Sequence, residues 1–178
     1  MDGKELLSAN DFAKKVELCA KASKEVSNGS FIICARTDAR GVMGIEETIR
    51  RSKLYIDAGA DMIFPEGLAS REEFKLVAKE LKAHKKDVFI LANMTEFGKT
   101  PYITHKEFEE YGYNCVIYPV STLRVAMRAV DDMLEELKQK GTLEGQLGNM
   151  QTRKDLYNTL HYVPGEEWHY PSSTKKDY

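Results

Sequence analysis

Polar and charged residues stand where several short apolar runs of this sequence end. Arg36 follows the run at residues 31–35, and Glu66 comes shortly after the run at 60–64. A charge at the end of a buried strand needs a partner, because an unpaired buried charge is costly. We therefore predict that Arg36 and Glu66 either form a structural ion pair or hold an anionic ligand. Position alone leaves both interpretations open.

The ends of the next two runs add groups that can bind carboxylates. Asn93 and Thr95 follow the run at residues 88–92 and offer an amide and a hydroxyl as hydrogen-bond donors. After the run at 114–118, Arg124 falls in the first turn of a predicted helix. A cation is unfavourable at a helix N-terminus, and a bound anion would explain it. Together these residues predict a carboxylate-binding site at one edge of a sheet.

A parallel sheet is the element that would bring these residues together. The apolar runs are nearly continuous, which is typical of strands buried on both faces of a parallel sheet. The polar residues that follow successive runs are 26 to 30 residues apart, the length of one strand-plus-helix unit, which predicts an α/β fold. Segments with helical periodicity lie at residues 11–26, 45–58, 70–83, 104–111 and 121–140.

Local signals mark where several of these helices begin and end. Ser8 and Asn10 precede the first helix and are both suitable as its N-cap. Ser70 and Thr104 are each followed three residues later by a glutamate, which is the pattern of a capping box. Gly141 follows the longest helix and predicts its end.

The pattern predicts two parts in the chain. Residues 1–148 carry the strand-and-helix units, and residues 149–178 carry one more helix, at 149–161, and an irregular tail. The tail contains Trp168, Tyr170 and Pro171, which are interpreted either as a cover for apolar surface on a neighbouring subunit or as a frayed terminus.

Composition narrows the class of protein. The 178 residues are 42% hydrophobic and 30% charged with a net charge of −2, so we expect neither a nucleic-acid partner nor a membrane partner. Cys19, Cys34 and Cys115 lack metal-ligand spacing and are interpreted as structural thiols in a reducing compartment. We expect no leader sequence, and no apolar stretch approaches the roughly 20 residues of a membrane span. We expect a soluble cytoplasmic protein, with the mitochondrial matrix as the alternative in a eukaryote.

Five short stretches carry a resemblance to a known family. Through them the sequence resembles the isocitrate lyase/phosphoenolpyruvate mutase superfamily, and within it the methylisocitrate lyase branch. The stretches are ARTDA at 35–39, FPE at 64–66, LANMTEFG at 91–98, YPVS at 118–121 and MQTR at 150–153.

The resemblance implies a fold and a reaction. The implied fold is the C-terminal half of a (β/α)₈ barrel, with four parallel strands and their helices, followed by a C-terminal helix and tail. A closed barrel typically has roughly 250 residues, more than this chain contains. The implied reaction is the Mg²⁺-dependent cleavage of 2-methylisocitrate, a small tricarboxylate, to pyruvate and succinate. The implied assembly is a homotetramer that exchanges C-terminal helices.

The resemblance also assigns roles to residues. Arg36 and Glu66 are the expected catalytic residues: Arg36 holds a carboxylate or developing negative charge, and Glu66 orients that region. Asn93 and Thr95, together with Arg124, bind the succinate-forming carboxylates. Arg153 completes the pocket. The expected substrate-binding residues are Arg36, Glu66, Asn93, Thr95, Arg124 and Arg153.

Two parts of the family's active site have no match in this chain. The proton-donating cysteine of a Lys-Lys/Arg-Cys-Gly-His motif would lie before Gly3, and the Mg²⁺-binding aspartates would also lie there, so no metal ligand is expected here. Since an open half-barrel exposes two edge strands, we interpret the chain as a truncated lyase, with a natural half-barrel as the alternative. We expect the chain alone to show no lyase turnover and negligible Mg²⁺ affinity. An oxaloacetate decarboxylase, another 2-oxo or 2-hydroxy acid lyase, and a non-catalytic oligomerisation partner remain alternative functions.

Overall fold

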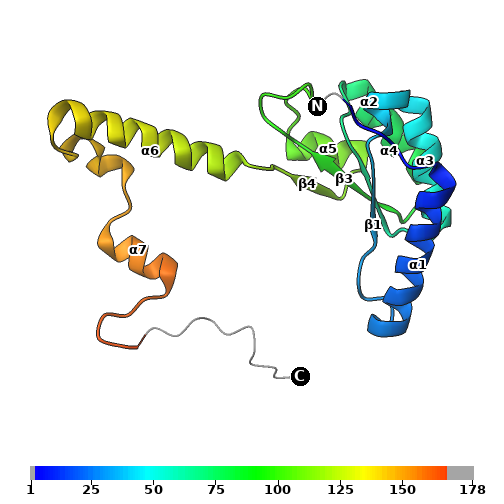
Figure 1. Cartoon of the computed structure of the whole chain (residues 1–178), viewed down its shortest axis with the longest axis horizontal. Coiled ribbons are helices and arrows are strands. Elements are labelled where there is room, and N and C mark those ends of the chain that lie inside the picture. Colours follow the sequence, from blue (N-terminus) through cyan, green and yellow to red (C-terminus); the bar gives the residue numbers. More distant parts are fainter. Residues whose placement is uncertain (1–2, 168–178) are drawn as a thin grey trace. The chain divides into compact units, whose positions relative to one another are not determined.

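Helices and strands alternate through most of the chain (Figure 1). The computed structural model describes residues 3–167. The predicted tail residues Trp168, Tyr170 and Pro171 lie outside the described residues. The elements in order are α1 (Ala9–Ser27), β1 (Cys34–Thr37), α2 (Ala39–Met43), α3 (Ile45–Asp57), β2 (Met62–Pro65), α4 (Arg71–His84), β3 (Phe89–Asn93), α5 (His105–Tyr111), β4 (Cys115–Ile117), α6 (Ser121–Lys140), the 3₁₀-helix η1 (Glu144–Asn149) and α7 (Arg153–Leu160).

The strands form one parallel sheet in the order β1-β2-β3-β4. In register, Arg36 of β1 lies opposite Phe64 of β2, and Asn93 of β3 lies opposite Ile117 of β4. Every strand therefore ends at the same edge of the sheet, so the residues at those ends lie near one another. The predicted α/β fold with a parallel sheet is confirmed.

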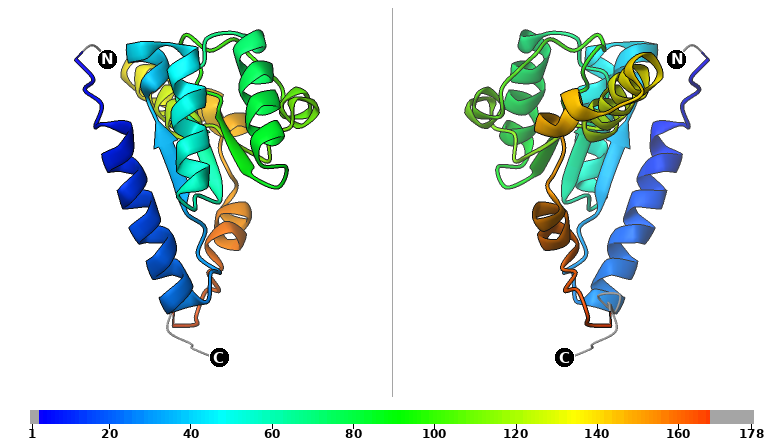
Figure 2. Two further views of the ribbon diagram at one scale, coloured as in Figure 1. Left: turned by 90° about the vertical axis from the view of Figure 1, so that its right-hand side faces the viewer. Right: turned by 90° about the vertical axis from the view of Figure 1, so that its left-hand side faces the viewer.

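Helices cover one face of this sheet. Ala35, Ile63, Ile90 and Ala92 point into a core with residues of α1, α3, α4 and α5 and are almost completely buried. In the two views of Figure 2, α3 and α4 lie in front of the strands on the left and behind them on the right. This burial follows the period-two alternation of a strand with one covered face.

Residues 3–124, taken by themselves, supply no such cover for the other face of the sheet. Cys34 and Arg36 are exposed there, and Phe89 is 42% exposed. Within these residues, the prediction of strands buried on both faces is therefore wrong for this face. Cys34, which was interpreted as a structural thiol, is exposed. A continuous apolar run predicts the burial of both faces, whereas residues 3–124 supply a helical layer for only one.

The first strand begins later than the apolar run predicts. Phe31 is 68% exposed and precedes the strand, which spans Cys34–Thr37. Arg36 is therefore a strand residue rather than the residue after a strand. Pairing with β2 decides this boundary, because Arg36 and Thr37 find register partners there and Phe31 does not.

Most of the predicted helix signals form the expected contacts. Ser8 accepts a hydrogen bond from the Asp11 amide and caps α1, and Thr104 forms a complete capping box at α5. Ser70 caps α4, but its capping box is incomplete because the Glu73 carboxylate binds Arg40 and the Ala69 amide instead. The longest helix, α6, ends at Lys140, as Gly141 predicts.

The chain divides into two compact units, residues 1–124 and residues 125–178. The predicted division after residue 148 stays a prediction. In the second unit, the predicted helix at 149–161 is shorter and follows a 3₁₀-helix that the sequence did not indicate. The Glu136 carboxylate joins α6 to η1 by accepting hydrogen bonds from the Gln146 side chain, at 2.7 Å, and from the Gly145 amide.

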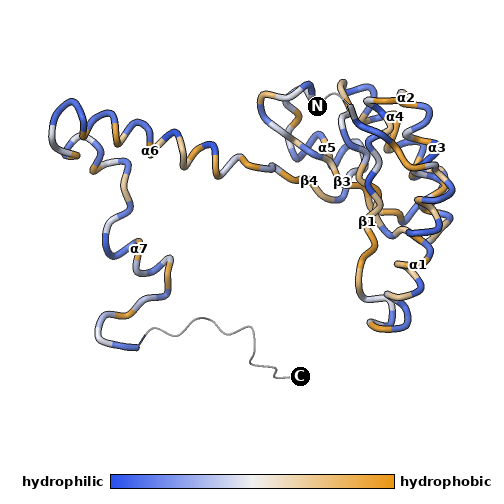
Figure 3. The backbone as a smooth tube through the Cα atoms, in the orientation of Figure 1, coloured by the Kyte–Doolittle hydropathy of each residue, from blue (hydrophilic) through white to orange (hydrophobic). Residues whose placement is uncertain are grey.

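Helix α6 exposes apolar side chains along its length. Figure 3 shows hydrophobic residues at intervals between hydrophilic ones on this helix, and none of its residues is buried. The helix is too polar for a bilayer, and no other described helix has the length and apolar character of a membrane span. The exposed apolar residues of α6 are Leu123, Val125, Met127, Val130, Leu134 and Leu137.

Candidate functional site

The ends of the strands bring several of the predicted site residues together. Arg36 of β1 donates hydrogen bonds from Nε and Nη2 to the two carboxylate oxygens of Asp38, at 2.9 and 3.0 Å. Its guanidinium carbon also lies 5.0 Å from the centre of the Phe64 ring on the neighbouring strand. Arg36 is thus held in one orientation by a bidentate ion pair and a cation–π contact.

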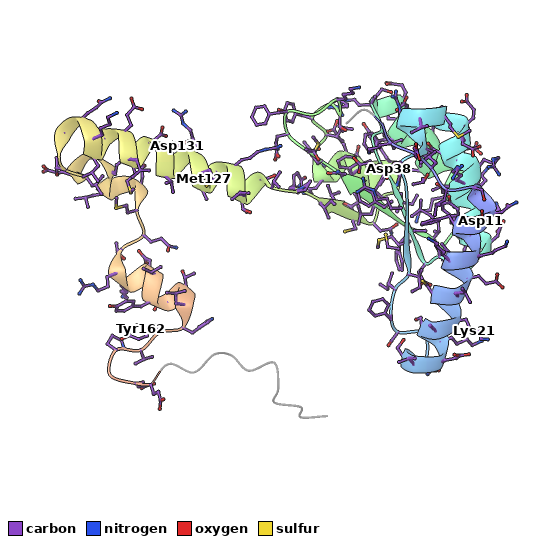
Figure 4. All side chains as sticks on the ribbon, viewed as in Figure 1. Asp11, Lys21, Asp38, Met127, Asp131 and Tyr162 are labelled. Atoms are coloured by element: carbon purple, nitrogen blue, oxygen red, sulfur yellow. The ribbon has the colours of Figure 1, made fainter. Side chains whose placement is uncertain are left out.

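Asp38 is a site residue that the sequence reasoning did not single out. Figure 4 labels it at the beginning of α2, where it is the N-cap residue. Hydrogen bonds from Arg36 lower the pKa of Asp38 from 3.8 to about 2, the Lys4 ammonium group adds to this effect, and burial opposes it. Asp38 could have been recognised from the sequence, because it lies two residues after Arg36 in the ARTDA stretch.

One ion pair and two hydrogen bonds link side chains from β1 across the edge of the sheet to β3. The Glu66 carboxylate lies 3.7 Å from Nη2 of Arg36 and accepts a hydrogen bond from the Asn93 amide at 3.2 Å. The Asn93 carbonyl in turn accepts a hydrogen bond from the Thr95 hydroxyl at 2.7 Å. The structure therefore brings together Arg36, Glu66, Asn93 and Thr95.

A pocket of about 540 Å³ adjoins these side chains. Glu66, Asn93 and Thr95 line it, and so do Lys4 and Lys99. Arg36 and Asp38 line a neighbouring cavity of about 190 Å³ instead. The first pocket thus offers an amide, a hydroxyl, a carboxylate and two ammonium groups, a combination that suits a polar anionic molecule.

Arg124 is bound to the loop that follows β3. Its Nη1 donates hydrogen bonds to the Glu96 main-chain carbonyl at 2.9 Å and to the Glu96 carboxylate at 3.2 Å. The structure gives it no hydrogen bond to Asn93 or Thr95. Glu96, which the sequence reasoning also left out, is thus the direct partner of this predicted site residue.

Arg153 belongs to the second unit. It is the first residue of α7 and lies between Thr152 and Asp155, which form the capping box of this helix. It lines an open pocket of about 440 Å³ together with Tyr157 and Tyr162. Its part in the site stays a prediction.

The carboxylates at the sheet edge do not fit a magnesium site. Mg²⁺ prefers several oxygen ligands in octahedral geometry. Within residues 3–167, no group of three or more His, Cys, Asp or Glu side chains could hold a metal ion. Asp38 is engaged by Arg36 and Lys4, and Glu96 is engaged by Arg124.

Comparisons with known proteins give a consistent result. The chain matches the phosphoenolpyruvate phosphomutase family model over residues 1–138. It is 46% identical over 162 residues to a Corynebacterium glutamicum protein named probable 2-methylisocitrate lyase 1, an alignment that covers 91% of this chain and 51% of that protein. It is 45% identical over 162 residues to the 2-methylisocitrate lyase of Aeropyrum pernix, covering 91% of this chain and 49% of the relative.

A solved structure agrees with these sequence matches. The crystal structure of 2,3-dimethylmalate lyase, a PEP mutase/isocitrate lyase superfamily member, superposes with a TM-score of 0.76 at 31% identity. The match covers 88% of this chain and 52% of that one. The chain spans about half the length of the curated relatives it matches.

Proposed function

The chain belongs to the phosphoenolpyruvate phosphomutase family, within the isocitrate lyase/PEP mutase superfamily, and from this we propose that it carries the carboxylate-binding half of a carbon–carbon lyase active site. The proposed reaction is the cleavage of 2-methylisocitrate to pyruvate and succinate. The observation that carries the proposal is a linked set of side chains beside a pocket at the strand ends: Arg36 forms an ion pair with Glu66, and hydrogen bonds join Glu66 to Asn93 and Asn93 to Thr95. Parallel α/β folds place their active sites at this edge.

The proposed reaction separates charge, and the residues of this chain would stabilise that charge. The substrate alcohol loses its proton, and its oxygen becomes the carbonyl oxygen of pyruvate. The carbon–carbon bond breaks, and its electron pair moves to the departing carbon, where a neighbouring carboxylate stabilises the carbanion. A proton then completes succinate. Preorganised donors and cations lower the barrier to such a step, because they need no reorganisation as charge develops.

Each residue of the site has a part in the proposed reaction. Arg36, held by Asp38, faces substrate carboxylate or developing negative charge with its remaining N–H groups. Glu66 orients Arg36 and Asn93. Asn93 and Thr95 bind carboxylate oxygens, with the Thr95 hydroxyl turning from Asn93 toward the substrate. Arg124 and Arg153 are proposed to bind the remaining carboxylates.

The proposal includes groups outside the described residues. Mg²⁺ would supply polarisation of the substrate oxygen, and its ligands would lie outside residues 3–167, because the carboxylates described here do not fit it. The acid that protonates the carbanion would lie outside them as well. Further β/α units would cover the exposed face of the sheet and complete a (β/α)₈ barrel, for which this chain is the C-terminal half.

A related substrate is the second candidate. The structural likeness to 2,3-dimethylmalate lyase favours another 2-hydroxy acid lyase reaction at the same site. The two candidates differ in the substituents of the substrate, and one methyl group changes binding by only about 1–3 kcal/mol. Pyruvate release from each candidate substrate, measured with the complete enzyme, separates them.

Binding of succinate tests the carboxylate-binding proposal directly. We expect the chain to bind succinate and Asn93→Ala to weaken that binding about tenfold or more, because a hydrogen bond to a charged ligand is lost. Isothermal titration calorimetry measures the affinity, and Asn149→Ala, which alters an exposed amide of the second unit, is the matched control. The proposal fails if succinate produces no binding or if both variants bind as the unsubstituted chain does.

A further inference from the structure

Glu96 joins the third strand end to the fourth. It lies three residues after Asn93, in the loop that follows β3. The Ser121 hydroxyl, at the start of α6, lies 2.7 and 2.8 Å from its two carboxylate oxygens. Arg124, one turn further along α6, reaches both the carboxylate and the main-chain carbonyl of Glu96. A single residue thus holds the guanidinium through its backbone and its side chain.

The backbone is strained on both sides of this contact. Phe97, directly after Glu96, has a φ of 61°, and Val120, directly before Ser121, has a φ of 57°. Left-handed backbone is unfavourable for a bulky side chain and especially for a β-branched one. Phe97 gains no compensating burial, since it is 86% exposed. Such strain persists only where surrounding contacts impose it, and it gathers at functional sites.

The contacts of Arg124 leave part of its guanidinium available. Within residues 3–124, only Nη1 makes hydrogen bonds, while Nε and Nη2 make none. The side chain is 40% exposed, and its guanidinium carbon lies 5.5 Å from the centre of the Phe97 ring. A guanidinium can present two parallel N–H groups to a carboxylate. The edge formed by Nε and Nη2 remains able to do this.

We propose that Glu96 is a positioning residue for Arg124: it holds the guanidinium through Nη1 and turns the Nε and Nη2 edge toward a carboxylate of the substrate. The inference rests on the proposed function and adds to it a residue that does not itself touch substrate. Glu96 fixes the direction of the cation before the substrate arrives, so that less side-chain freedom is lost on binding.

Glu96 stays ionised over the range in which such an enzyme would act. The hydrogen bond from Ser121 lowers the pKa of Glu96, a backbone hydrogen bond and Arg124 lower it further, and burial opposes them. The alternative role is purely structural, in which Glu96 only ties the loop to the beginning of α6 through Ser121. Removal of the Ser121 hydroxyl isolates that role, because Arg124 keeps both of its contacts with Glu96.

The test compares Glu96→Gln with Ser121→Ala, and uses Glu110→Gln as a control for the loss of one negative charge at an exposed site. Succinate affinity is measured by calorimetry on the full chain, and the order of Arg124 is measured by NMR from its Nε–H resonance. We expect Glu96→Gln to weaken succinate binding about two- to fivefold, the range for a half-exposed charge pair. The Arg124 resonance should broaden or exchange faster in this variant only.

The outcomes separate this inference from the proposed function. If the unsubstituted chain binds succinate and Glu96→Gln binds it equally well with an unchanged Arg124 resonance, the inference is overturned and the proposed function stands. Equal losses in Glu96→Gln and Ser121→Ala assign the structural role and also overturn it. If the unsubstituted chain binds no succinate, the proposed function fails and the inference fails with it.

Discussion

Asp38 shows how one carboxylate can organise a cationic site. It accepts two hydrogen bonds from Arg36 and is also paired with Lys4. Its side chain is 22% exposed, so solvent screens these interactions only in part. The ion pair with Asp38 fixes the Arg36 side chain and balances most of its charge. The Glu66 carboxylate lies further away, at 3.7 Å from Nη2 of Arg36. At the scale of single residues, Asp38 thus holds both Arg36 and Lys4, and Glu96 holds Arg124.

The lowered pKa of Asp38 predicts a stability that depends on pH. Because the folded pKa of about 2 lies below the ordinary aspartate pKa of 3.8, the ionised form stabilises the fold above about pH 4, and this contribution is lost as pH falls toward 2. We expect Asp38→Asn to lower the free energy of unfolding at neutral pH by about 1–2 kcal/mol after solvent screening.

Urea unfolding of both proteins over this pH range measures the effect. The difference between them should shrink as the pH approaches 2. Asp131→Asn, at an exposed carboxylate labelled in Figure 4, is the control and should change stability little at any pH. An Asp38→Asn variant as stable as the unsubstituted chain at neutral pH would show that the ion pair contributes nothing.

Helix α5 anchors the far end of the loop that carries Glu96. Its capping box joins Thr104 to Glu107, and Glu107 also pairs with Arg71 of α4. Arg71 donates a further hydrogen bond, at 2.6 Å, to the main-chain carbonyl of Tyr102. Phe108 of α5 is fully buried against Phe74 of α4, with ring centres 5.2 Å apart. The loop therefore begins at a strand and ends at a packed and capped helix.

Removal of the capping hydroxyl should loosen this anchor. We expect Thr104→Ala to lower the free energy of unfolding by about 1 kcal/mol, because the Glu107 amide at the third helical position loses its acceptor. Thr104→Ser keeps the hydroxyl and should restore most of the stability. Urea unfolding measures both variants, and a loss in Thr104→Ser as large as in Thr104→Ala would argue against the capping role.

Two apolar surfaces of the chain remain exposed when each unit is taken by itself. One is the face of the sheet that includes Phe89, and the other is the apolar side of α6. On α6, Leu123, Met127, Val130, Leu134 and Leu137 recur at spacings of four and three residues, the pattern of a helix that packs against another. Exposed surfaces of this kind favour association. Of the two, the apolar side of α6 supports the expected homo-oligomer, in which a tetramer would exchange C-terminal helices.

Association through α6 can be tested with one substitution. We expect the chain to elute as an oligomer in size-exclusion chromatography with light scattering, and Leu134→Gln to shift it toward the monomer because apolar burial is lost. Ala129→Gln, at an exposed α6 position outside this repeat, should leave the oligomer unchanged. A monomeric unsubstituted chain, or equal effects of both substitutions, would contradict this role of α6.

The sequence alone was sufficient for the features that depend on local patterns. Apolar runs, helical periodicity and caps such as Ser8 and Thr104 act within a few residues, so the parallel α/β fold could be predicted from them. Because parallel strands end at one edge, the positions of Arg36, Glu66 and Asn93 along the chain also predicted that they would lie together. The resemblance then indicated the family that the comparisons confirm.

Only the tertiary structure decided which groups bind one another. Strand register and loop paths brought Glu96 to Arg124, 28 residues away, and Glu66 to Asn93, 27 residues away. Hydrogen bonds depend on differences of a few tenths of an ångström, which sequence spacing does not encode. The sequence pattern could not predict the exposed face of the sheet either. An apolar run indicates that a strand is to be buried, but the packing of other elements determines which of its faces is covered.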